Sequence, residues 1–247
     1  MEEIENRSIT IGDIVARDFR TASIFKGAGI DFCCGGKKTL AETCADKGID
    51  QDALMEKLEK VESVPGTITH NFNEWQPGFL CDYIVNVHHE FVRKSLPDLV
   101  FYTQKIANVH GGHHPELLEV ADLFTQVNNE LLQHMKKEET LLFPAVKELF
   151  SSGSEKSKQT INAEITLLLG EHEFAGGAID RISVITDGYK LPEDACNSYR
   201  IAFDLLEKFG DDLHTHVHLE NNILFPKTLD ASIGAGSRKT EVRSQKF

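Results

Sequence analysis

The stretch HMKKEETLLFP at residues 134–144 occurs a second time as HVHLENNILFP at residues 216–226. The two copies share the pattern H-x-x-x-E-x-x-[LI]-L-F-P. A shorter match, His-Glu-Phe, lies upstream of each copy and begins at His89 and at His172. The first histidines of the upstream and downstream motifs are 45 residues apart in one half and 44 in the other. We therefore predict two helical hairpins of one design that pack against each other.

Long apolar periodicity surrounds these motifs. Four segments, roughly residues 79–109, 115–150, 158–187 and 192–229, carry apolar residues at the i, i+3, i+4 and i+7 positions of amphipathic helices. Their separators, HGGHHP, SSGSEKSK and DGYKLP, are short. Short connections make sequential helices antiparallel, so the sequence predicts an all-α protein built on an up-down four-helix bundle. A proline six residues after each repeated glutamate is expected to kink its helix.

A smaller helical unit precedes the bundle. Apolar spacing predicts helices over residues 10–26, 39–47 and 52–61, the second capped by Thr39. The next stretch is rich in Pro and Gly and lacks apolar periodicity, which predicts a linker. The predicted organisation is a small helical domain with a Cys-Cys-Gly-Gly motif at 1–64, a linker at 65–78, the bundle at 79–230 and a disordered tail at 231–247.

Composition excludes several classes of protein. The chain has 247 residues, with 39 acidic and 26 basic side chains and a net charge of −13, which would repel the phosphates of nucleic acids and anionic membranes. Its five cysteines are an odd number and two are adjacent, unlike a secreted disulfide framework. The sequence shows neither a signal-peptide pattern nor an apolar run approaching the ~18 residues of a membrane span. We expect a soluble cytoplasmic protein with reduced thiols.

The repeated motifs predict a metal centre. Residues four apart on a helix share a face, so each repeat presents an imidazole and a carboxylate together. In an antiparallel hairpin, residues equidistant from the turn lie level. The midpoints between the paired histidines fall at residues 111–112 and 194, inside the predicted connections. The side chains expected at one level of the bundle are therefore His89, His134, Glu138, His172, His216 and Glu220.

Four imidazoles and two carboxylates are too many ligands for one tetrahedral zinc ion. They suit two ions of intermediate hardness bridged by the carboxylates, such as iron or manganese. Six buried polar groups without metal would also be costly. The chain has no H-E-x-x-H, and no histidine has a glutamate three residues before it, so neither a zinc protease nor a ferritin-like site is supported.

An alternative pairing exists in the second repeat. His214 and His218 form their own i, i+4 pair two residues off the proposed face. The second repeat alone leaves this pair open, but the first repeat has Met135 where a second histidine would stand, which favours His216 and Glu220. His70, His113 and His114 are predicted to be surface residues, His110 a cap or surface group, and Cys44, Cys81 and Cys196 buried thiols.

Cys33 and Cys34 form a second candidate site in the turn Cys-Cys-Gly-Gly. A Gly-rich turn near two lysines could leave these thiols exposed and reactive with a lowered pKa, or make them transient cluster ligands. In the alternative interpretation the glycines supply special backbone angles and the cysteines pack as small apolar residues. Chemistry alone leaves both interpretations open.

Taken in order, DFCCGG, HHEF, HMKKEETLLFP, EHEFAGG and HVHLENNILFP resemble the Repair of Iron Centers family, the YtfE/ScdA-type di-iron proteins, from about residue 8 to 229. The resemblance implies an N-terminal domain with the paired cysteines and a hemerythrin-like bundle with a non-haem di-iron site. It also implies a role in restoring iron-sulfur clusters damaged by nitric oxide or peroxide. Carried over by motif, the same six side chains are the ligands of two iron ions per chain, with Glu138 and Glu220 as bridges.

Several functions compete on this basis. The first is supply of iron to damaged iron-sulfur proteins, with Cys33 and Cys34 contacting the recipient or receiving iron. The second is a non-haem di-iron oxidoreductase that reduces nitric oxide or a peroxide, so the sequence leaves open whether the protein is an enzyme. Oxygen binding or sensing of the hemerythrin kind is third, and a structural bundle holding zinc is last. The resemblance further suggests a homodimer.

Overall fold

A computed structural model describes residues 9–62 and 71–241. The chain divides into two compact units. One comprises the described residues up to Leu80 together with those from Val217 onward, and the other is Cys81–His216. Over the described ranges the only β feature is an isolated bridge between Thr10 and Thr39, and every named element is helical. The predicted all-α class is confirmed.

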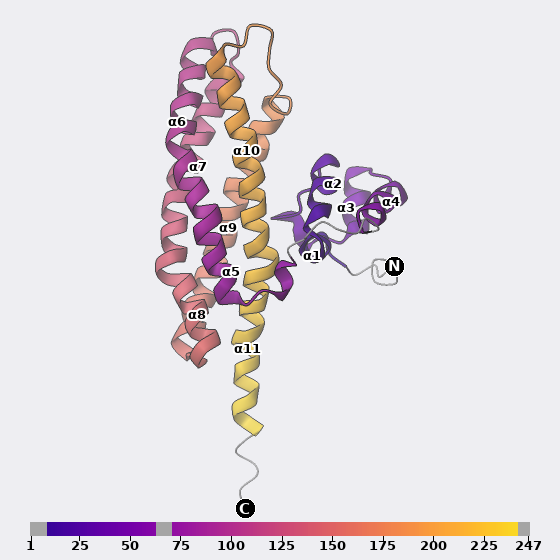
Figure 1. Cartoon of the computed structure of the whole chain (residues 1–247), viewed down its shortest axis with the longest axis vertical. Helices are drawn as coiled ribbons and strands as arrows, with labels where there is room; N and C mark the ends of the chain where they lie inside the picture. Colours follow the sequence, from indigo (N-terminus) through magenta and orange to yellow (C-terminus); the bar gives the residue numbers. More distant parts are fainter. Residues whose placement is uncertain (1–8, 63–70, 242–247) are drawn as a thin grey trace, which may run out of the picture. The chain divides into compact units, whose positions relative to one another are not determined.

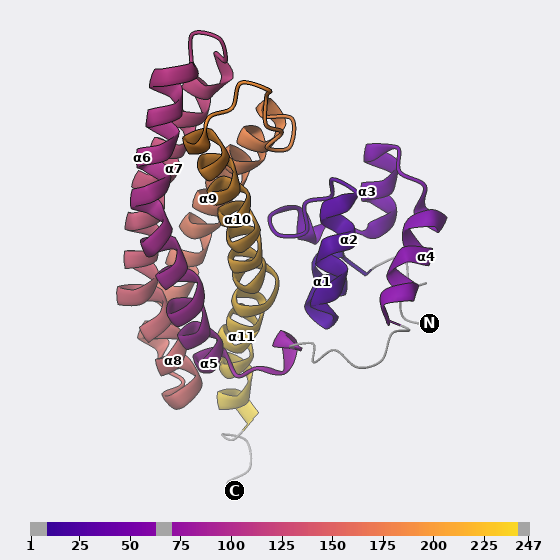
Figure 2. The same ribbon diagram turned by 45° about the horizontal axis from the view of Figure 1, so that its top comes forward.

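The unit Cys81–His216 is a bundle. Figures 1 and 2 both show α6, α7, α9 and α10 running side by side. The predicted four-helix bundle is therefore confirmed. Along the chain its elements are α5 (Pro77–Tyr83), which begins in the other unit, then η4 (Ile84–His89), α6 (Glu90–His110), α7 (Glu116–Lys137), η5 (Glu138–Leu142), α8 (Phe143–Ser152), α9 (Glu155–Ile185) and α10 (Asn197–Leu219).

Apolar side chains close the middle of this bundle. Phe124 of α7 and Phe209 of α10 are fully buried and meet edge to face, with ring centroids 5.4 Å apart. Gly210 allows a close approach to α9, because a Cβ there would lie 3.0 Å from Ile179 Cγ2. Burial of a large apolar side chain such as Phe124 or Phe209 contributes about 1.5–3 kcal/mol to the free energy of unfolding. The packing fixes the relative heights of the helices, and with them the side chains they carry.

Three helices contain a π-helical turn that periodicity did not predict. The turns are η4, η5 and η6 (Glu220–Leu224). The N–H of Phe143 bonds to the carbonyl of Glu138, five residues back, and Phe225 does the same with Glu220. The turns η5 and η6 each precede a Phe-Pro pair, which η4 does not. A proline has no N–H and its ring clashes with the carbonyl four residues back in a regular α-helix, so a wider turn before it relieves that conflict.

The other unit is formed by short helices and the end of the chain. The predicted single helix over residues 10–26 is broken in the structure at Asp18. That residue is extended, with φ −141°, and its carboxylate accepts from the N–H of Arg20 to start a new turn. The elements are α1 (Ile11–Arg17), η1 (Phe19–Thr21), α2 (Ala22–Gly27), η2 (Gly35–Lys37), α3 (Leu40–Lys47), α4 (Gln51–Glu62), η3 (Phe72–Glu74) and, after Val217, η6 and α11 (Phe225–Glu241).

Local signals of the second N-terminal helix are as expected. The Thr39 hydroxyl accepts from the N–H of Glu42 while the Glu42 carboxylate accepts from the N–H of Thr39, which forms a capping box. Gly48 ends the helix with a φ of +64°, in the left-handed region. These two residues explain why α3 begins and ends where the sequence suggested.

The predicted linker and tail are only partly within the described residues. Residues 65–70 lie outside them, whereas residues 72–74 form η3 and Pro77 begins α5. The tail predicted from residue 231 is instead helical as far as Glu241. A helix that has already formed gains one hydrogen bond for each residue added, which favours its continuation beyond residue 230. Residues 242–247 lie outside the described part. No helix among the described residues is long and apolar enough to cross a membrane.

Candidate metal centre

The six predicted ligand residues lie on four helical segments, η4–α6, α7–η5, α9 and α10–η6. His89 ends η4, and Glu138 begins η5 one turn after His134 of α7. In the same way, Glu220 begins η6 one turn after His216 of α10. Each is at most 1% exposed, so water does not solvate their polar atoms. The complete set is His89, His134, Glu138, His172, His216 and Glu220.

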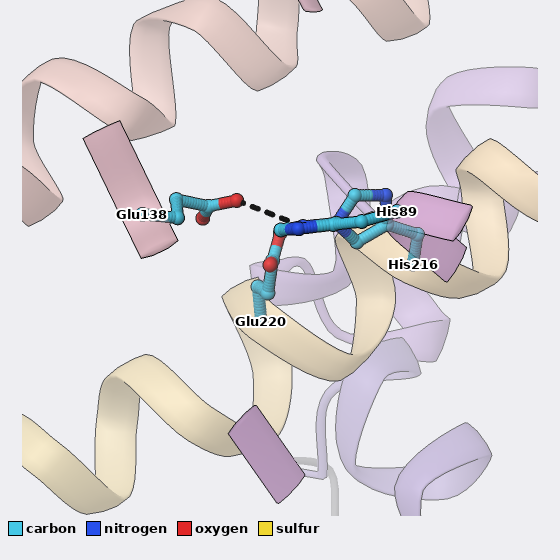
Figure 3. Close-up of side chains that lie close together, drawn as sticks. All are labelled: His89, Glu138, His216 and Glu220. Atoms are coloured by element: carbon cyan, nitrogen blue, oxygen red, sulfur yellow. Dashed lines mark ion pairs between the residues drawn. The ribbon is translucent and has the colours of Figure 1, made fainter. Parts of the chain in front are cut away.

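The structure brings these side chains together in two groups. In each group one donor atom from every residue lies within 4.8 Å of the others. The first group is His89, Glu138, His216 and Glu220, whose side chains Figure 3 shows pointing toward one another from η4, η5 and the continuous α10–η6 segment. The second group is His134, Glu138, His172 and Glu220. Both carboxylates belong to both groups. An arrangement with two shared carboxylates is what two adjacent cations would require.

The Nε2 atoms of His89 and His134 both lie near the carboxylate of Glu138. His89 Nε2 lies 3.2 Å from Glu138 Oε2, and His134 Nε2 lies 3.3 Å from the same oxygen. His172 Nε2 lies 3.0 Å from His134 Nε2. His89 of the first group and His134 of the second therefore approach the same oxygen of Glu138, as expected if that carboxylate is shared between two ions.

Carboxylates behind two of these histidines hold the rings in this orientation. His89 Nδ1 lies 2.7 Å from Glu139 Oε1, and His134 Nδ1 lies 2.9 Å from Glu171 Oε2. When Nδ1–H donates to a carboxylate, the Nε2 lone pair is left for a metal and the imidazole becomes more basic. Arg93 in turn donates to Glu139, so the carboxylate is itself held in place.

The charges around these outer carboxylates favour their ionised form. The hydrogen bond from His134 lowers the pKa of Glu171 to about 2 against the opposing effect of burial, and Lys137 adds to the lowering. Burial raises the pKa of Glu139, but hydrogen bonds from His89 and Arg93 outweigh it and leave that pKa below its ordinary value. Both carboxylates therefore stay acceptors for the imidazole N–H groups at neutral pH.

The donor set fits divalent cations of intermediate hardness. Glu138 and Glu220 are both completely buried, and two such carboxylates near one another need positive charge between them. Imidazole suits zinc, copper, iron and nickel, whereas carboxylate oxygen suits harder ions such as manganese. A mixed set of both types favours iron or manganese over magnesium or calcium.

Sequence reasoning missed the residues that support the ligands. His88 stacks on His216 with ring centroids 5.6 Å apart and planes 13° from parallel, and its Nδ1 lies 2.9 Å from Asp212 Oδ1. Glu139 and Glu171 were also overlooked. The available signal was adjacency, because each of these glutamates is the immediate chain neighbour of a predicted ligand.

The alternative pair His214 and His218 belongs to neither group. His214 Nε2 pairs with Asp180 at 3.1 Å on the bundle surface. His218 is fully buried, its Nδ1 lies 3.4 Å from the carbonyl oxygen of Phe32, and burial lowers its pKa to about 4. The two four-residue groups therefore contain His216 and Glu220, the pair that comparison with the first repeat favoured.

The remaining histidines and cysteines need one correction. Cys196 was expected to be buried but is exposed, because it lies in the loop immediately before α10, where its Sγ lies 3.2 Å from His110 Nε2. Cys44 and Cys81 are buried, as predicted. His113 is exposed and His114 partly exposed, while His70 lies outside the described residues.

The two adjacent cysteines differ in accessibility. Cys33 is 4% exposed and Cys34 is partly exposed. The hydrogen bond with Cys34, burial and the nearby carboxylate of Asp31 all raise the pKa of Cys33 well above its ordinary value. Of the two interpretations left open by the sequence, a lowered thiol pKa does not apply to Cys33, because an acidic side chain lies beside it.

Comparison with known proteins defines the class to which this site belongs. Residues 82–228 match the model described as the Hemerythrin HHE cation binding domain, and residues 7–62 match ScdA_N, a Domain of Unknown function (DUF542). The first match covers more than half of the chain and contains all six buried ligand candidates. The chain thus carries a cation-binding hemerythrin-type domain behind an ScdA_N domain.

Full-length relatives make the assignment more specific. The chain is 34% identical over 218 residues to the Iron-sulfur cluster repair protein ScdA of Staphylococcus epidermidis, covering 88% of this chain and 96% of that one. It is 33% identical over 226 residues to the Iron-sulfur cluster repair protein YtfE of Pectobacterium atrosepticum, covering 90% and 97%. The YtfE of Yersinia pseudotuberculosis is 32% identical over 229 residues, covering 92% and 99%. The chain belongs to the family of these ScdA and YtfE proteins.

Proposed function

We propose that this protein holds two iron ions in its bundle and supplies iron to damaged iron-sulfur clusters. The observation that carries the proposal is the buried set of four imidazoles and two carboxylates, in which Glu138 and Glu220 belong to both four-residue groups. The name of the relatives, iron-sulfur cluster repair protein, supports the choice of reaction. Iron is here the cargo as well as the metal that the site holds.

The proposed ligands can release as well as bind iron. Each proposed ion is held by two neutral imidazoles and shared carboxylates, without thiolates, so protonation of an imidazole competes with the metal. The mixed set of imidazole and carboxylate ligands suits ferrous iron, and it lacks the closed set of thiolates typical of structural zinc sites. A site of this kind suits a carrier that must give up its ion.

The partners of such a carrier would be iron-sulfur proteins that have lost iron. The exposed surface carries an excess of carboxylates, with a net charge of −13 for the chain, and nucleic acid is not expected among the partners. We propose the cytoplasm as the compartment, in keeping with the reduced thiols expected from the cysteine pattern.

Metal content tests the site directly. The full chain, purified without oxygen, is compared with the double variant Glu138→Leu/Glu220→Leu and with a matched control, Glu173→Leu/Glu207→Leu, which changes two exposed glutamates of the same bundle. We expect about two irons per chain in the parent and control and a large loss in the double variant. Helical circular dichroism of all three proteins separates loss of ligands from loss of fold.

Cluster recovery then tests the reaction. A dehydratase whose cluster has been damaged by nitric oxide is incubated with each protein, and its activity is followed. The parent should restore activity in proportion to the iron it carries, and the Glu138→Leu/Glu220→Leu variant should not. Equal recovery with a variant that binds no iron would end the donor proposal.

Reduction of nitric oxide is the second candidate function. Each group offers four protein donors, and an octahedral iron ion takes six, so a small molecule could bind as well. Bound iron would supply electrons to that molecule, while the buried residues around the groups would exclude water. Anaerobic turnover with a reductant distinguishes the two functions, because nitrous oxide in excess of the iron present requires catalysis.

A further inference from the structure

The turn that carries the adjacent cysteines brings three metal-binding side chains together. Donor atoms of Asp31, Cys33 and Cys34 all lie within 4.8 Å of one another. The Cys33 and Cys34 sulfurs are 4.0 Å apart, and Cys33 Sγ lies 3.1 Å from Asp31 Oδ1. In a tetrahedral site with metal–sulfur bonds of ~2.3 Å, the sulfur–sulfur edge is about 3.8 Å and the sulfur–oxygen edge about 3.6 Å. The sulfur–sulfur separation is close to its edge, whereas the sulfur–oxygen separation is shorter than its edge because the Cys33 thiol donates a hydrogen bond to Asp31.

The carboxylate of Asp31 is fixed by the backbone of the same turn. Its Oδ1 accepts from the N–H groups of Cys33 and Cys34 at 2.8 and 3.1 Å, and its Oδ2 accepts from Gly35 at 2.7 Å. The Cys33 thiol also donates to Oδ1, at 3.1 Å. An ionised carboxylate has about four acceptor positions, so a cation that replaces the thiol proton frees the position which that thiol occupies. The bonds orient the oxygen toward the thiols before any ion arrives.

The side-chain amide of Asn222, which lies in η6 of the same compact unit, also holds the turn in place. Asn222 Nδ2 donates to the carbonyl oxygens of Phe32 and Cys33, at 3.2 and 3.0 Å. Gly36 makes room for this amide, because a Cβ there would lie 2.7 Å from Asn222 Oδ1. The thiols are therefore held in a defined place rather than left on a mobile loop.

We propose that Asp31, Cys33 and Cys34 form a second metal site that takes a thiophilic divalent cation and exchanges it. Three protein donors leave a fourth tetrahedral position open, as in sites where a further ligand enters, whereas structural zinc sites use four. Asp31 is exposed and Cys34 partly exposed, so the open position is reachable by a ligand from another molecule. Binding releases the two thiol protons to solvent and transfers no electron.

The identity of the natural ion rests on the proposed function. If the bundle supplies iron, the ion at this turn is ferrous iron in transit between the bundle and a recipient cluster. Two thiolates and one carboxylate bind such an ion through donors unlike those of the bundle, which contains no thiolate among its six candidates. A spectroscopic signal specific to sulfur ligation can therefore separate the two sites.

Cobalt(II) titration of the reduced full chain tests this inference. The protein, in a non-thiol reductant, carries Glu138→Leu/Glu220→Leu so that the bundle site is removed. We expect the near-ultraviolet charge-transfer band that thiolate ligation gives to cobalt(II), saturating at one equivalent. The band should be lost in Cys33→Ser/Cys34→Ser and be unchanged in Cys196→Ser, which removes an exposed thiol elsewhere.

Two milder variants guard against misfolding. Cys34→Ser keeps the buried Cys33 and should reduce the band, while Asp31→Asn keeps an oxygen acceptor but loses the charge and should weaken cobalt binding about tenfold, or ~1.4 kcal/mol. Absence of the band, or its persistence without Cys33 and Cys34, would overturn the inference. Failure of the bundle proposal would appear separately, as iron content unchanged by Glu138→Leu/Glu220→Leu.

Discussion

Replacement of Glu171 tests how the carboxylates behind the ligands act on the metal centre. Its Oε2 lies 2.9 Å from His134 Nδ1 and its side chain is 16% exposed. A hydrogen bond to a charged group contributes about 1.5–3 kcal/mol, and a neutral acceptor gives roughly half as much. Glu171→Gln keeps an acceptor oxygen and should therefore cost about 1.4 kcal/mol, or about tenfold in iron affinity. Glu171→Ala removes the acceptor and should cost up to about a hundredfold.

The assay is competition for ferrous iron with a chelator of known affinity, without oxygen. Glu173→Gln provides the control, since it lies two residues further along the same helix and is exposed. We expect the parent and Glu173→Gln to bind ferrous iron equally well. Glu171→Gln should bind it more weakly, and Glu171→Ala most weakly. An iron affinity of Glu171→Ala within threefold of the parent would refute the claim that this carboxylate orients His134 and raises its basicity.

Three further changes test the packing that positions the sites. Phe124→Ala removes a buried ring that contacts Phe209 and should cost about 3–5 kcal/mol in the free energy of unfolding, measured with urea; a cost below about 1 kcal/mol would contradict the packing described. Thr39→Ala removes a capping box and should cost about 1 kcal/mol, seen as a lower Tm. Gly36→Ala should displace Asn222 and speed amide hydrogen exchange in the cysteine turn; adding Asn222→Ala should then have little further effect, and full additivity would argue against a shared contact.

Much of the bundle could be predicted because its signals are local and repeated. The spacing of His134 and Glu138 is a property of any α-helix, and the symmetry of 45 and 44 residues about two turns placed four histidines at one height. The assignment of these residues as ligands remains a prediction until metal is measured. Short connections and apolar periodicity were enough to predict the antiparallel order of the helices.

The parts that could not be predicted depend on contacts distant in sequence or on small changes of backbone. Asn222 lies 190 residues after Phe32, whose carbonyl it binds, and neither residue has a local signal for that contact. The π-helical turns change the helical period over only a few residues, which a pattern averaged over longer windows does not resolve. The break at Asp18 arises because a short acidic side chain can cap a new turn in the middle of an apolar pattern.

The two groups of donors each draw one histidine and one glutamate from each half of the repeat. A single hairpin of this design can complete neither group. A half-length ancestor could have built the centre only by pairing with a second copy of itself about a twofold axis, and it would have lost the centre on dilution. Joining the halves in one chain makes assembly unimolecular, so the number of complete centres no longer depends on the square of the protein concentration. A protein made sparingly can then still present a whole centre in every copy.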